Sequence, residues 1–310
     1  MVMTAHQGNG LPEDAAGTAR PNVLIIDSFA LLFRGFYSMA MVGNYMRTSE
    51  GLCTNGLYQF SRYLLDAVKV FRPSHVVCAF DMGAHTFRNE LHPEYKANRE
   101  QPPEELVPQF DKLWELVDAF DIPAVGQPGY EADDIIGSLA RKFSDQQAEV
   151  NILTGDGDAL QLLNERTKVT FMKKGFGNYQ TVTLSDLPEL KEIERPEQII
   201  DLKALMGDAS DNIPGCPGVG PKTAVKLLRE FDHIDRLFEN IDQVKGKLQQ
   251  RLLEHKEMIY MSKKLAAIRT DLDLGVSLEQ CELGWDREKL LNKLEQFEWK
   301  TLIRQLSETA

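Results

Sequence analysis

Four short apolar runs in the first part of the chain predict buried β-strands. They are rich in β-branched residues and comprise Asn22–Asp27, His75–Asp81, Val150–Asp156 and Lys168–Met172. Continuous apolar runs of this kind suit strands that are covered on both faces, as in a parallel sheet. Between the runs, apolar residues recur at helical spacing in Gly56–Phe71, Glu104–Phe120 and Ala132–Phe143. Strands that alternate with helices predict an α/β domain.

Beyond about residue 195 the pattern is helical only. Four segments have helical spacing: Pro196–Met206, Pro221–Phe231, Lys245–Ala267 and Asp286–Leu306. We therefore expect a core over residues 22–195 and a helical region over residues 196–310. Residues 1–21 are polar and lack the apolar stretch of a secretory signal, so we expect them to form a flexible tail.

One polar segment, residues 82–103, is too long for an ordinary connection in an α/β domain, so it is expected to be functional or mobile. It carries Arg88, Lys96 and Arg99 beside the aromatic residues Phe87 and Tyr95. Cations interleaved with aromatic rings suit a single nucleic-acid strand, whose bases stack while its phosphates pair. A solvated loop is the alternative interpretation.

The composition is that of a globular protein. The chain has 310 residues, 43% of them hydrophobic and 26% charged, which excludes a disordered, collagenous or coiled-coil chain. No apolar run approaches the ~18 residues of a membrane span, so we expect no membrane association. Four cysteines without metal-finger or redox spacing favour a reducing, cytoplasmic compartment.

The net charge of −12 taken alone argues against a nucleic-acid-binding protein, unless the acidic residues gather at one site. Three of them, Asp27, Asp81 and Asp156, end strand-like runs. The carboxyl ends of parallel strands meet at one edge of a sheet, where ligands bind in open α/β folds. A turn or helix cap explains any one of these aspartates, but it explains three at equivalent positions less well.

Six further carboxylates lie in short clusters. They are Glu131, Asp133 and Asp134 in the first turn of a helix, Asp158 next to Asp156, and the pair Asp208 and Asp211. Capping and dipole chemistry accounts for one or two acids at a helix start, not for three. Unit charges 4 Å apart repel by ~1 kcal/mol in water and ~4 kcal/mol at an effective dielectric constant of 20, so a converging set needs cations. Oxygen ligands select Mg²⁺ or Mn²⁺, and two such ions suit phosphoester hydrolysis.

A glycine-rich loop precedes the segment Pro221–Phe231. It contains Gly218 and Gly220, and the helix that follows carries Lys222, Thr223 and Lys226. The loop resembles a P-loop, but Pro221 separates the last glycine from the lysine and no strand precedes it, so an ATPase is disfavoured. A helix–hairpin–helix-like element, which offers backbone N–H groups and a helix N-terminus to a DNA phosphate, fits better. The alternative interpretation is that the loop is only a turn that connects two helices.

Together these motifs identify a family. The chain resembles the 5′-nuclease (flap endonuclease-like) superfamily, and most of all the 5′→3′ exonuclease domain of bacterial DNA polymerase I. The resemblance runs from about Asn22 to Leu306 and rests on VLIIDS, AFD, TFR, PEYKANR, GYEADD, TGDGDALQLL, LMGDASDNIPG and PGVGPKTA, in that order. Gly157 departs from the family pattern, where a lysine is common, but that side chain is not a ligand.

The resemblance implies a PIN-like core with a mostly parallel twisted sheet flanked by helices, and a helical region carrying a helix–three-turn–helix DNA-binding motif. Residues 82–103 match the family's arch over the active site, and we expect them to be mobile without DNA. Lys96 matches the catalytic lysine, Arg99 the arginine beside it, and Tyr95 a residue that stacks on terminal bases. Arg88 belongs to the same DNA-binding segment.

The resemblance also assigns two Mg²⁺ or Mn²⁺ ions. Asp81, Glu131 and Asp133 would serve the first ion, with Asp27 acting through water. Asp156, Asp158 and Asp211 would serve the second, and Asp134 and Asp208 would support them. The glycine-rich loop would hold K⁺ through backbone carbonyls.

The function expected from these observations is a structure-selective 5′–3′ exonuclease and flap endonuclease. It would cleave phosphodiesters at 5′ ends and single-strand/duplex junctions in DNA or RNA–DNA hybrids, as a stand-alone monomer, in primer removal and repair. A PIN-type ribonuclease would not need the glycine-rich clamp. A non-catalytic, structure-specific DNA-binding protein would not need every carboxylate. An aspartyl phosphotransferase would need D-x-D at the first strand, which Asp27-Ser-Phe does not supply.

Overall fold

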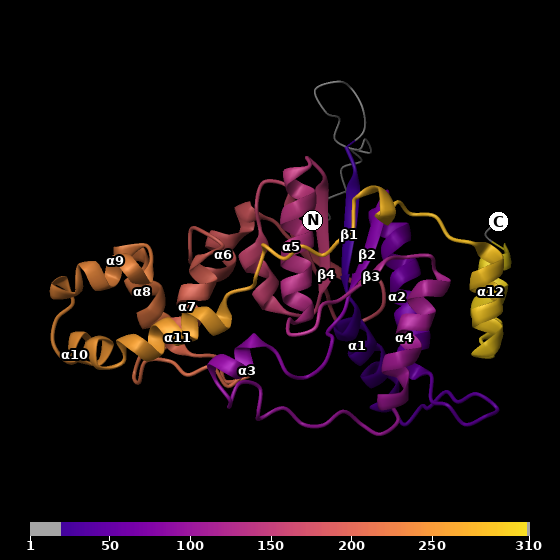
Figure 1. The fold of residues 1–310 in the computed structure, drawn as a ribbon, viewed down its shortest axis with the longest axis horizontal. Helices are drawn as coiled ribbons and strands as arrows, with labels where there is room; N and C mark the ends of the chain where they lie inside the picture. The colour runs from indigo at the N-terminus through magenta and orange to yellow at the C-terminus, as the bar shows by residue number, and fades with distance from the viewer. Residues whose placement is uncertain (1–19, 309–310) are drawn as a thin grey trace, which may run out of the picture.

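A computed structural model describes residues 20–308 of the chain (Figure 1). The expected flexible tail lies outside the described residues, apart from Arg20 and Pro21. Arg20 forms an ion pair with Glu149 at 3.5 Å. No helix in residues 20–308 is both long enough and apolar enough to cross a membrane.

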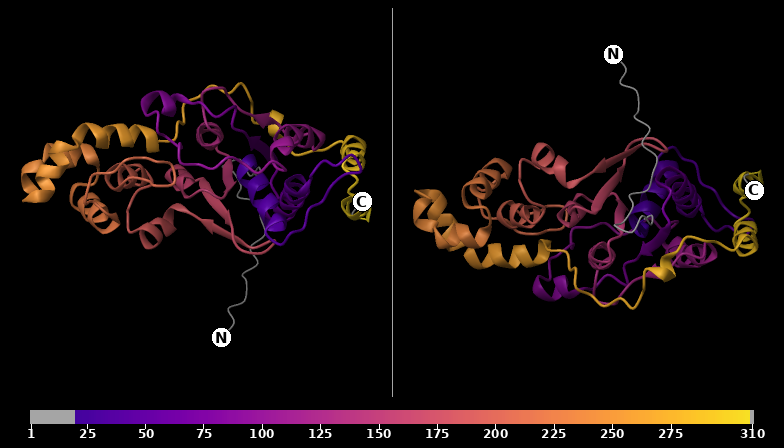
Figure 2. Two further views of the ribbon diagram at one scale, coloured as in Figure 1. Left: turned by 90° about the horizontal axis from the view of Figure 1, so that it is seen from below. Right: turned by 90° about the horizontal axis from the view of Figure 1, so that it is seen from above.

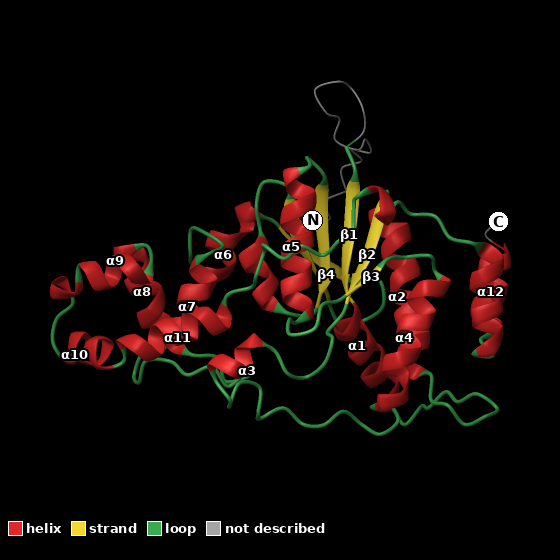
Figure 3. Cartoon of the chain, viewed as in Figure 1, coloured by secondary structure: helices red, strands yellow, loops and turns green. Residues whose placement is uncertain are grey.

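One six-stranded sheet forms the centre of the molecule (Figure 3), in the order β3-β2-β1-β4-β5-β6. The strands are β1 (Asn22–Asp27), β2 (His75–Ala79), β3 (Ala124–Val125), β4 (Glu149–Thr154), β5 (Thr167–Met172) and β6 (Tyr179–Val182). All neighbours pair in parallel except β5 and β6. The expected mostly parallel α/β sheet is thus confirmed. The sequence pattern missed β3, which is only two residues long, and β6, which is polar and lies at the edge.

The alternation of side chains along β1 separates two apolar layers. Val23 and Ile25 face the layer that contains α5 (Ala132–Asp145), whereas Leu24 and Ile26 face the layer that contains α1 (Ser28–Ala40) and α2 (Asn55–Phe71). All four β1 side chains are fully buried. Helix α4 (Val107–Ala119) joins the second layer beside α2. The sheet is therefore covered on both faces, as its continuous apolar strands predicted.

The sequence analysis did not foresee helix α1, which follows β1 without a loop. Its N-terminus is capped by the side chain of Asp27. Most of its residues are apolar, so it lacks the separate polar face by which an amphipathic helix is identified in a sequence. It packs tightly on α2: a Cβ at Gly35 would lie only 2.8 Å from the Cβ of Gln59. The absence of a side chain at Gly35 allows this close approach.

Helices gather at one end of the molecule (Figures 1 and 2). They are α7 (Gln198–Met206), α8 (Pro221–Phe231), α9 (Ile234–Glu239), α10 (Lys247–Glu254) and α11 (Lys256–Ala266). Short helices α3 (Phe87–Leu91) and α6 (Leu187–Lys191) lie between this end and the sheet. The single helix expected over Lys245–Ala267 is broken at His255 into α10 and α11.

The last part of the chain returns to the opposite end of the molecule. Residues 267–286 run back across the core, and α12 (Arg287–Gln296) and α13 (Lys300–Glu308) pack over α2 and α4. The expected helix over Asp286–Leu306 is thus two helices, separated at Glu298, whose φ is 60°. Helices α12 and α13 bury their apolar residues in the layer of α1 and α2.

Candidate active site

The carboxyl ends of the central strands open into a cavity of about 900 Å³. Its lining includes five of the nine acidic residues singled out in the sequence: Asp27, Asp81, Glu131, Asp133 and Asp156. Lys96 and Arg99 line the same cavity. The three strand-end aspartates therefore meet at one edge of the sheet, because β2, β1 and β4 are adjacent and parallel.

Asp27 is held rigidly at the end of β1. One carboxylate oxygen accepts a hydrogen bond from the backbone N–H of Ala30 (3.1 Å), and the other accepts one from the hydroxyl of Thr154 (2.7 Å). Burial raises the pKa of Asp27 to about 6, and the nearby charges of Asp81 and Asp156 act in the same direction. An anionic Asp27 is therefore costly here unless a cation lies beside it.

The start of α5 supplies further acids to the cavity. Asp81 accepts a hydrogen bond from the backbone N–H of Ala132 (2.9 Å), which joins the end of β2 to this helix start. Burial raises the pKa of Asp81. Burial also raises the pKa of Asp133 well above its ordinary value, with added repulsion from Asp156 and Asp27. Desolvation and mutual repulsion thus favour protonation of this group of carboxyls, or neutralisation by bound cations.

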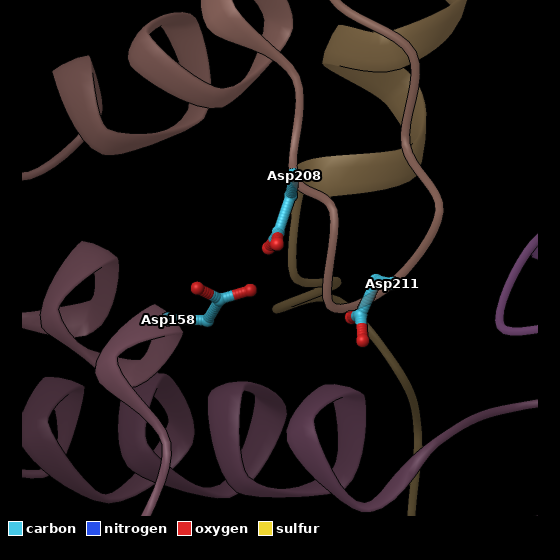
Figure 4. Close-up of side chains that lie close together, drawn as sticks. All are labelled: Asp158, Asp208 and Asp211. Atoms are coloured by element: carbon cyan, nitrogen blue, oxygen red, sulfur yellow. The ribbon is translucent and has the colours of Figure 1, made fainter. Parts of the chain in front are cut away.

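A second group of acids consists of Asp158, Asp208 and Asp211 (Figure 4). Each offers a carboxylate oxygen, and these oxygens lie within 4.8 Å of one another. Asp158 lies at the start of the 3-10 helix η1 (Gly157–Leu162), and the two others lie in the loop after α7. The grouping differs from the one expected: Asp208 joins this set directly, whereas Asp156 lines the cavity of the first group.

Lys203 of α7 lies between two members of this second group, and the sequence analysis did not single it out. Its ammonium group forms ion pairs with both Asp158 and Asp208. Burial raises the pKa of Asp158 to about 6, although Lys203 works against this shift. Burial would also raise the pKa of Asp208, but hydrogen bonds from Lys203 and Ser210 hold it below its ordinary value. Lys203 thus neutralises part of the acidic charge. The only feature of the sequence that could have identified it is its position five residues before Asp208.

Lys96 and Arg99 reach the acids from the 82–103 segment. The ammonium group of Lys96 contacts Glu131 at 2.9 Å, and the guanidinium group of Arg99 contacts Asp211 at 2.6 Å. The backbone N–H of Lys96 donates to the carbonyl of Asp211 (2.9 Å). The two cations therefore lie against one carboxylate from each group, Glu131 and Asp211.

Tyr95 does not present its ring to the cavity in this structure, which contradicts its expected role as a stacking surface. Only 4% of the residue is exposed. Its hydroxyl donates to Glu131 (3.0 Å) and also lies 3.4 Å from Asp211. Burial and the charge of Glu131 raise the pKa of Tyr95. Tyr95 thus serves as a neutral hydrogen-bond donor between two carboxylates.

Arg88 and Asp134 form a buried ion pair, which corrects two expectations. The guanidinium group of Arg88 binds both oxygens of Asp134, at 2.7 and 2.8 Å, and donates to the carbonyls of Leu265 (2.8 Å) and Ala267 (2.9 Å). Arg88 is 2% exposed, so it cannot contact DNA in this arrangement. Asp134 also accepts from the backbone N–H groups of Glu131 and Arg269, so its oxygens are occupied and it is not placed as a metal ligand.

The sequence analysis also missed an aromatic wall of the cavity. Phe29 and Phe33 of α1 and Phe110 and Trp114 of α4 line the same cavity as the acids. Phe29 packs edge-on against Phe110, with ring centroids 5.2 Å apart. The signal was weak, because two of these residues belong to the helix that the hydrophobic pattern did not reveal.

The glycine-rich loop leads directly into α8. Gly218 has a φ of 77°, and a Cβ there would overlap the guanidinium group of Arg251. Gly220 is the N-cap residue of α8. Lys222 and Lys226 are exposed on the first turns of the helix, whereas Thr223 is partly buried. The loop therefore leaves a helix N-terminus and two cations facing solvent.

The oxygen atoms of both carboxylate groups are suitable ligands for divalent metal ions. All are oxygens, which are the ligands that Mg²⁺ and Mn²⁺ prefer. Several are buried acids whose pKa is raised, so a cation beside them would relieve both desolvation and repulsion. The group of Asp158, Asp208 and Asp211 already holds a cation in the form of Lys203.

Family models match most of the chain. The model described as the 5′-3′ exonuclease N-terminal resolvase-like domain matches residues 22–188, and the model described as the 5′-3′ exonuclease C-terminal SAM fold matches residues 194–289. The chain is 43% identical over 288 residues to a 5′-3′ exonuclease of Bacillus subtilis, covering 92% of this chain and 95% of that protein. It is 40% identical over 293 residues to DNA polymerase I of the same species, of which it spans 33%.

Solved structures are similar as well. The bacteriophage T5 5′-exonuclease with bound zinc has a TM-score of 0.61 and 28% identity, and the match covers 79% of this chain and 89% of that one. The bacteriophage T5 flap endonuclease in a complex with DNA and metal ions has a TM-score of 0.64 and 27% identity, covering 79% and 88%.

Proposed function

This chain belongs to the 5′-3′ exonuclease family, and from that premise we propose that it is a structure-selective 5′ nuclease. It is a metal-dependent DNA nuclease of the phosphodiester hydrolase class. The finer proposal is that it recognises the junction between a duplex and a 5′ single strand and cleaves there. The supporting observation is that Lys96 and Arg99 contact one acid from each of the two carboxylate groups.

We assign the two divalent-metal positions to the two groups of acids. Asp27, Asp81, Glu131, Asp133 and Asp156 would hold one ion, and Asp158, Asp208 and Asp211 the other, with Mg²⁺ or Mn²⁺ as the ions. Bound there, the ions would supply an activated water and neutralise charge on the phosphate. Lys203 would release its contacts to the second group when an ion occupies it.

The remaining residues position the substrate and stabilise charge. Lys96 and Arg99 would donate to the non-bridging oxygens of the scissile phosphate, where negative charge increases in the transition state. Tyr95 would hold Glu131 and Asp211 in place through its hydroxyl. With Tyr95 buried, the aromatic wall of Phe29, Phe33, Phe110 and Trp114 would receive the bases instead.

The duplex would lie against the glycine-rich loop. Backbone N–H groups at the start of α8 and the side chains of Lys222, Thr223 and Lys226 would contact phosphates without reading the sequence. Carbonyls around Gly218 and Gly220 would hold K⁺ between the loop and the DNA. In this proposal residues 22–195 form the nuclease core and α7–α11 form the DNA clamp.

The wider role we propose is removal of RNA primers and flaps during replication and repair. The match to DNA polymerase I, of which the chain spans 33%, supports this role. RNA–DNA hybrids would be substrates, and the protein would act as a monomer in the cytoplasm. The four cysteines are all free and buried, which fits a reducing compartment.

The test is cleavage of a 5′-labelled flap duplex with Mg²⁺ and with EDTA, for the wild type and for an Asp156→Asn, Asp158→Asn variant. We expect cleavage near the junction that requires both the ion and the two aspartates, with a loss of at least about 100-fold in kcat. An Asp145→Asn, Asp273→Asn variant removes the same charge from exposed positions and should cleave normally. Tight flap binding without cleavage in Mg²⁺ or Mn²⁺ would instead favour a non-catalytic DNA-binding protein, and cleavage of single-stranded RNA in preference to flaps would favour a ribonuclease.

A further inference from the structure

A second cavity, of about 730 Å³, opens between α2, the turn between β5 and β6, and the α12–α13 pair. It shares no lining residue with the carboxylate cavity. Its floor and walls are apolar and are formed by Leu65, Val68, Phe176, Trp285, Leu290, Leu291, Leu302 and Leu306. We call it the C-terminal groove.

Two aromatic contacts anchor the α12–α13 segment beside the core. Trp299 packs edge-on against Tyr58 and donates to the hydroxyl of Thr54 (3.3 Å). Trp285, which also lines the groove, packs against Phe120, with ring centroids 5.8 Å apart. Between these anchors, the side chains of α2 do not fill the space below α12 and α13. The groove is thus a feature of the packing and does not require any segment to move.

Three cations surround this apolar floor. Arg62 and Lys69 are seven residues apart on α2, so they lie on one face about two turns, or roughly 10 Å, apart. Arg287 stands at the start of α12. Within residues 20–308, the salt bridges involve none of these three side chains. Arg62 instead lies over the ring of Phe176 (4.4 Å), and Arg287 donates to the carbonyl of Leu306 (3.4 Å).

The groove contains one carboxylate, Asp66, which already accepts a hydrogen bond from the hydroxyl of Tyr179 (2.7 Å). The rim is therefore locally cationic on a chain whose net charge is −12. An apolar hollow with a charged rim is the usual form of a site where a few side chains are buried and the surrounding charges select the partner. The volume lies within the range of about 300–1,000 Å³ that is typical of binding pockets.

We propose that the C-terminal groove is the docking site for an acidic peptide segment of a partner protein. Aromatic or aliphatic side chains of that segment fill the hollow, and its carboxylates pair with Arg62, Lys69 and Arg287. Charge complementarity selects this occupant: a nucleic-acid backbone would satisfy the cations but would leave the apolar floor uncovered. The site is independent of the nuclease chemistry, so the enzyme would be tethered without obstruction of its cavity.

The test uses the full chain and a short fluorescein-labelled peptide in which glutamates alternate with leucine and phenylalanine. We expect saturable binding by fluorescence anisotropy that weakens as salt is raised. A peptide with lysines in place of the glutamates should not bind. Arg62→Glu combined with Lys69→Glu should lower the affinity at least about tenfold. Leu291→Asp should also lower the affinity at least about tenfold, because it places a charge in the apolar part of the groove.

Two controls separate a site from a general charge effect. Lys191→Glu combined with Arg236→Glu makes the same charge change at exposed positions elsewhere and should leave binding unchanged. Flap cleavage by the Arg62→Glu, Lys69→Glu variant should match that of the wild type, which shows that the variant is folded.

Four outcomes would overturn the proposal. The first is a lack of specific binding, seen either as no binding of the acidic peptide or as equal weakening by the control variant. The second is displacement of the peptide by a single-stranded oligonucleotide whose own binding needs Arg62 and Lys69, which would make the groove a nucleic-acid site. The third is peptide binding only after removal of residues 1–19, which would assign the groove to the chain itself. The fourth is a dimer by light scattering that Leu291→Asp dissociates, which would assign it to a second copy.

Discussion

At the scale of single residues, the buried pair of Arg88 and Asp134 joins three parts of the chain. Arg88 lies in the segment 82–103, Asp134 in the first turn of α5, and the two carbonyls that Arg88 also binds stand at the C-terminal end of α11. The acids Glu131 and Asp133 belong to the same turn as Asp134. The pair therefore fixes the carboxylates of the cavity relative to the helices at the far end.

Arg88→Lys should destabilise the protein strongly, because a lysine cannot bind both oxygens of Asp134 and two carbonyls at once. Breaking a buried pair of this kind costs about 3–5 kcal/mol. Urea unfolding followed by tryptophan fluorescence measures the change. Arg141→Lys alters an exposed pair with Asp145 and should cost less than about 1 kcal/mol. Similar losses in the two variants would contradict the structural role of Arg88.

The raised pKa of Asp27 predicts that the stability of the metal-free protein depends on pH. Its pKa is about 6 in the folded protein and 3.8 ordinarily, so the folded state binds the proton more tightly. Protonation of Asp27 therefore stabilises the folded state by a free energy on the order of 3 kcal/mol. This stabilisation is fully present below pH ~4 and is lost as the pH rises through 6. In EDTA, Asp27→Asn should therefore raise the melting temperature at pH 7.5 more than at pH 5. An equal effect at both values would show that Asp27 is not desolvated.

At the scale of secondary-structure elements, the contact between α1 and α2 sets the geometry below the site. Asp27 caps α1, and Phe29 and Phe33 of α1 form part of the aromatic wall. The close approach of the two helices depends on Gly35, where a Cβ would also lie 3.0 Å from the carbonyl of Gly56. A displacement of α1 would thus move both an acid and part of the aromatic wall in the same cavity.

Gly35→Ala should force the two helices apart. We expect a loss of about 1–3 kcal/mol of stability, despite the better helix propensity of alanine, together with weaker flap binding. The measurements are chemical unfolding and KM. Gly284→Ala is the control, because a Cβ there meets nothing within 4 Å and the residue does not line the carboxylate cavity. A neutral effect at Gly35 would show that the helices can shift without consequence.

At the scale of the whole molecule, two carboxylate groups concentrate negative charge at one edge of the sheet, which bound cations would neutralise. Lys203, Lys96 and Arg99 compensate for only part of the negative charge. Bound divalent ions would remove the remaining repulsion and connect the sheet, through Asp158, to the loop that carries Asp208 and Asp211.

Mg²⁺ should therefore raise the melting temperature of the metal-free protein. Binding at 100 times the dissociation constant adds about 2.7 kcal/mol per ion. NaCl at the same ionic strength should have a smaller effect, because it only screens the charges. Asp158→Asn combined with Asp208→Asn should remove part of the stabilisation. An equal response to NaCl and Mg²⁺ would argue against specific ion sites.

The sequence by itself determined the main strands, the α/β class and the meeting of Asp27, Asp81 and Asp156 at one edge of the sheet. These properties follow from short-range patterns: a buried parallel strand is continuously apolar, and a strand end is where a polar residue must appear. The glycine-rich loop before α8 was readable for the same reason, because it depends on a few adjacent residues.

Only the tertiary structure decided which acids share a group and which are already paired. Asp134 stands among the acids of its helix turn, yet Arg88, 46 residues away, occupies both its oxygens. Tyr95 has the sequence context of an exposed aromatic residue, yet it is buried in a cluster with Ile213 and Leu265, and its hydroxyl donates to Glu131. Helices α12 and α13 lie far from α7–α11 because their apolar residues are buried beside α2. In each case the outcome depends on a partner distant in sequence, which no local pattern contains.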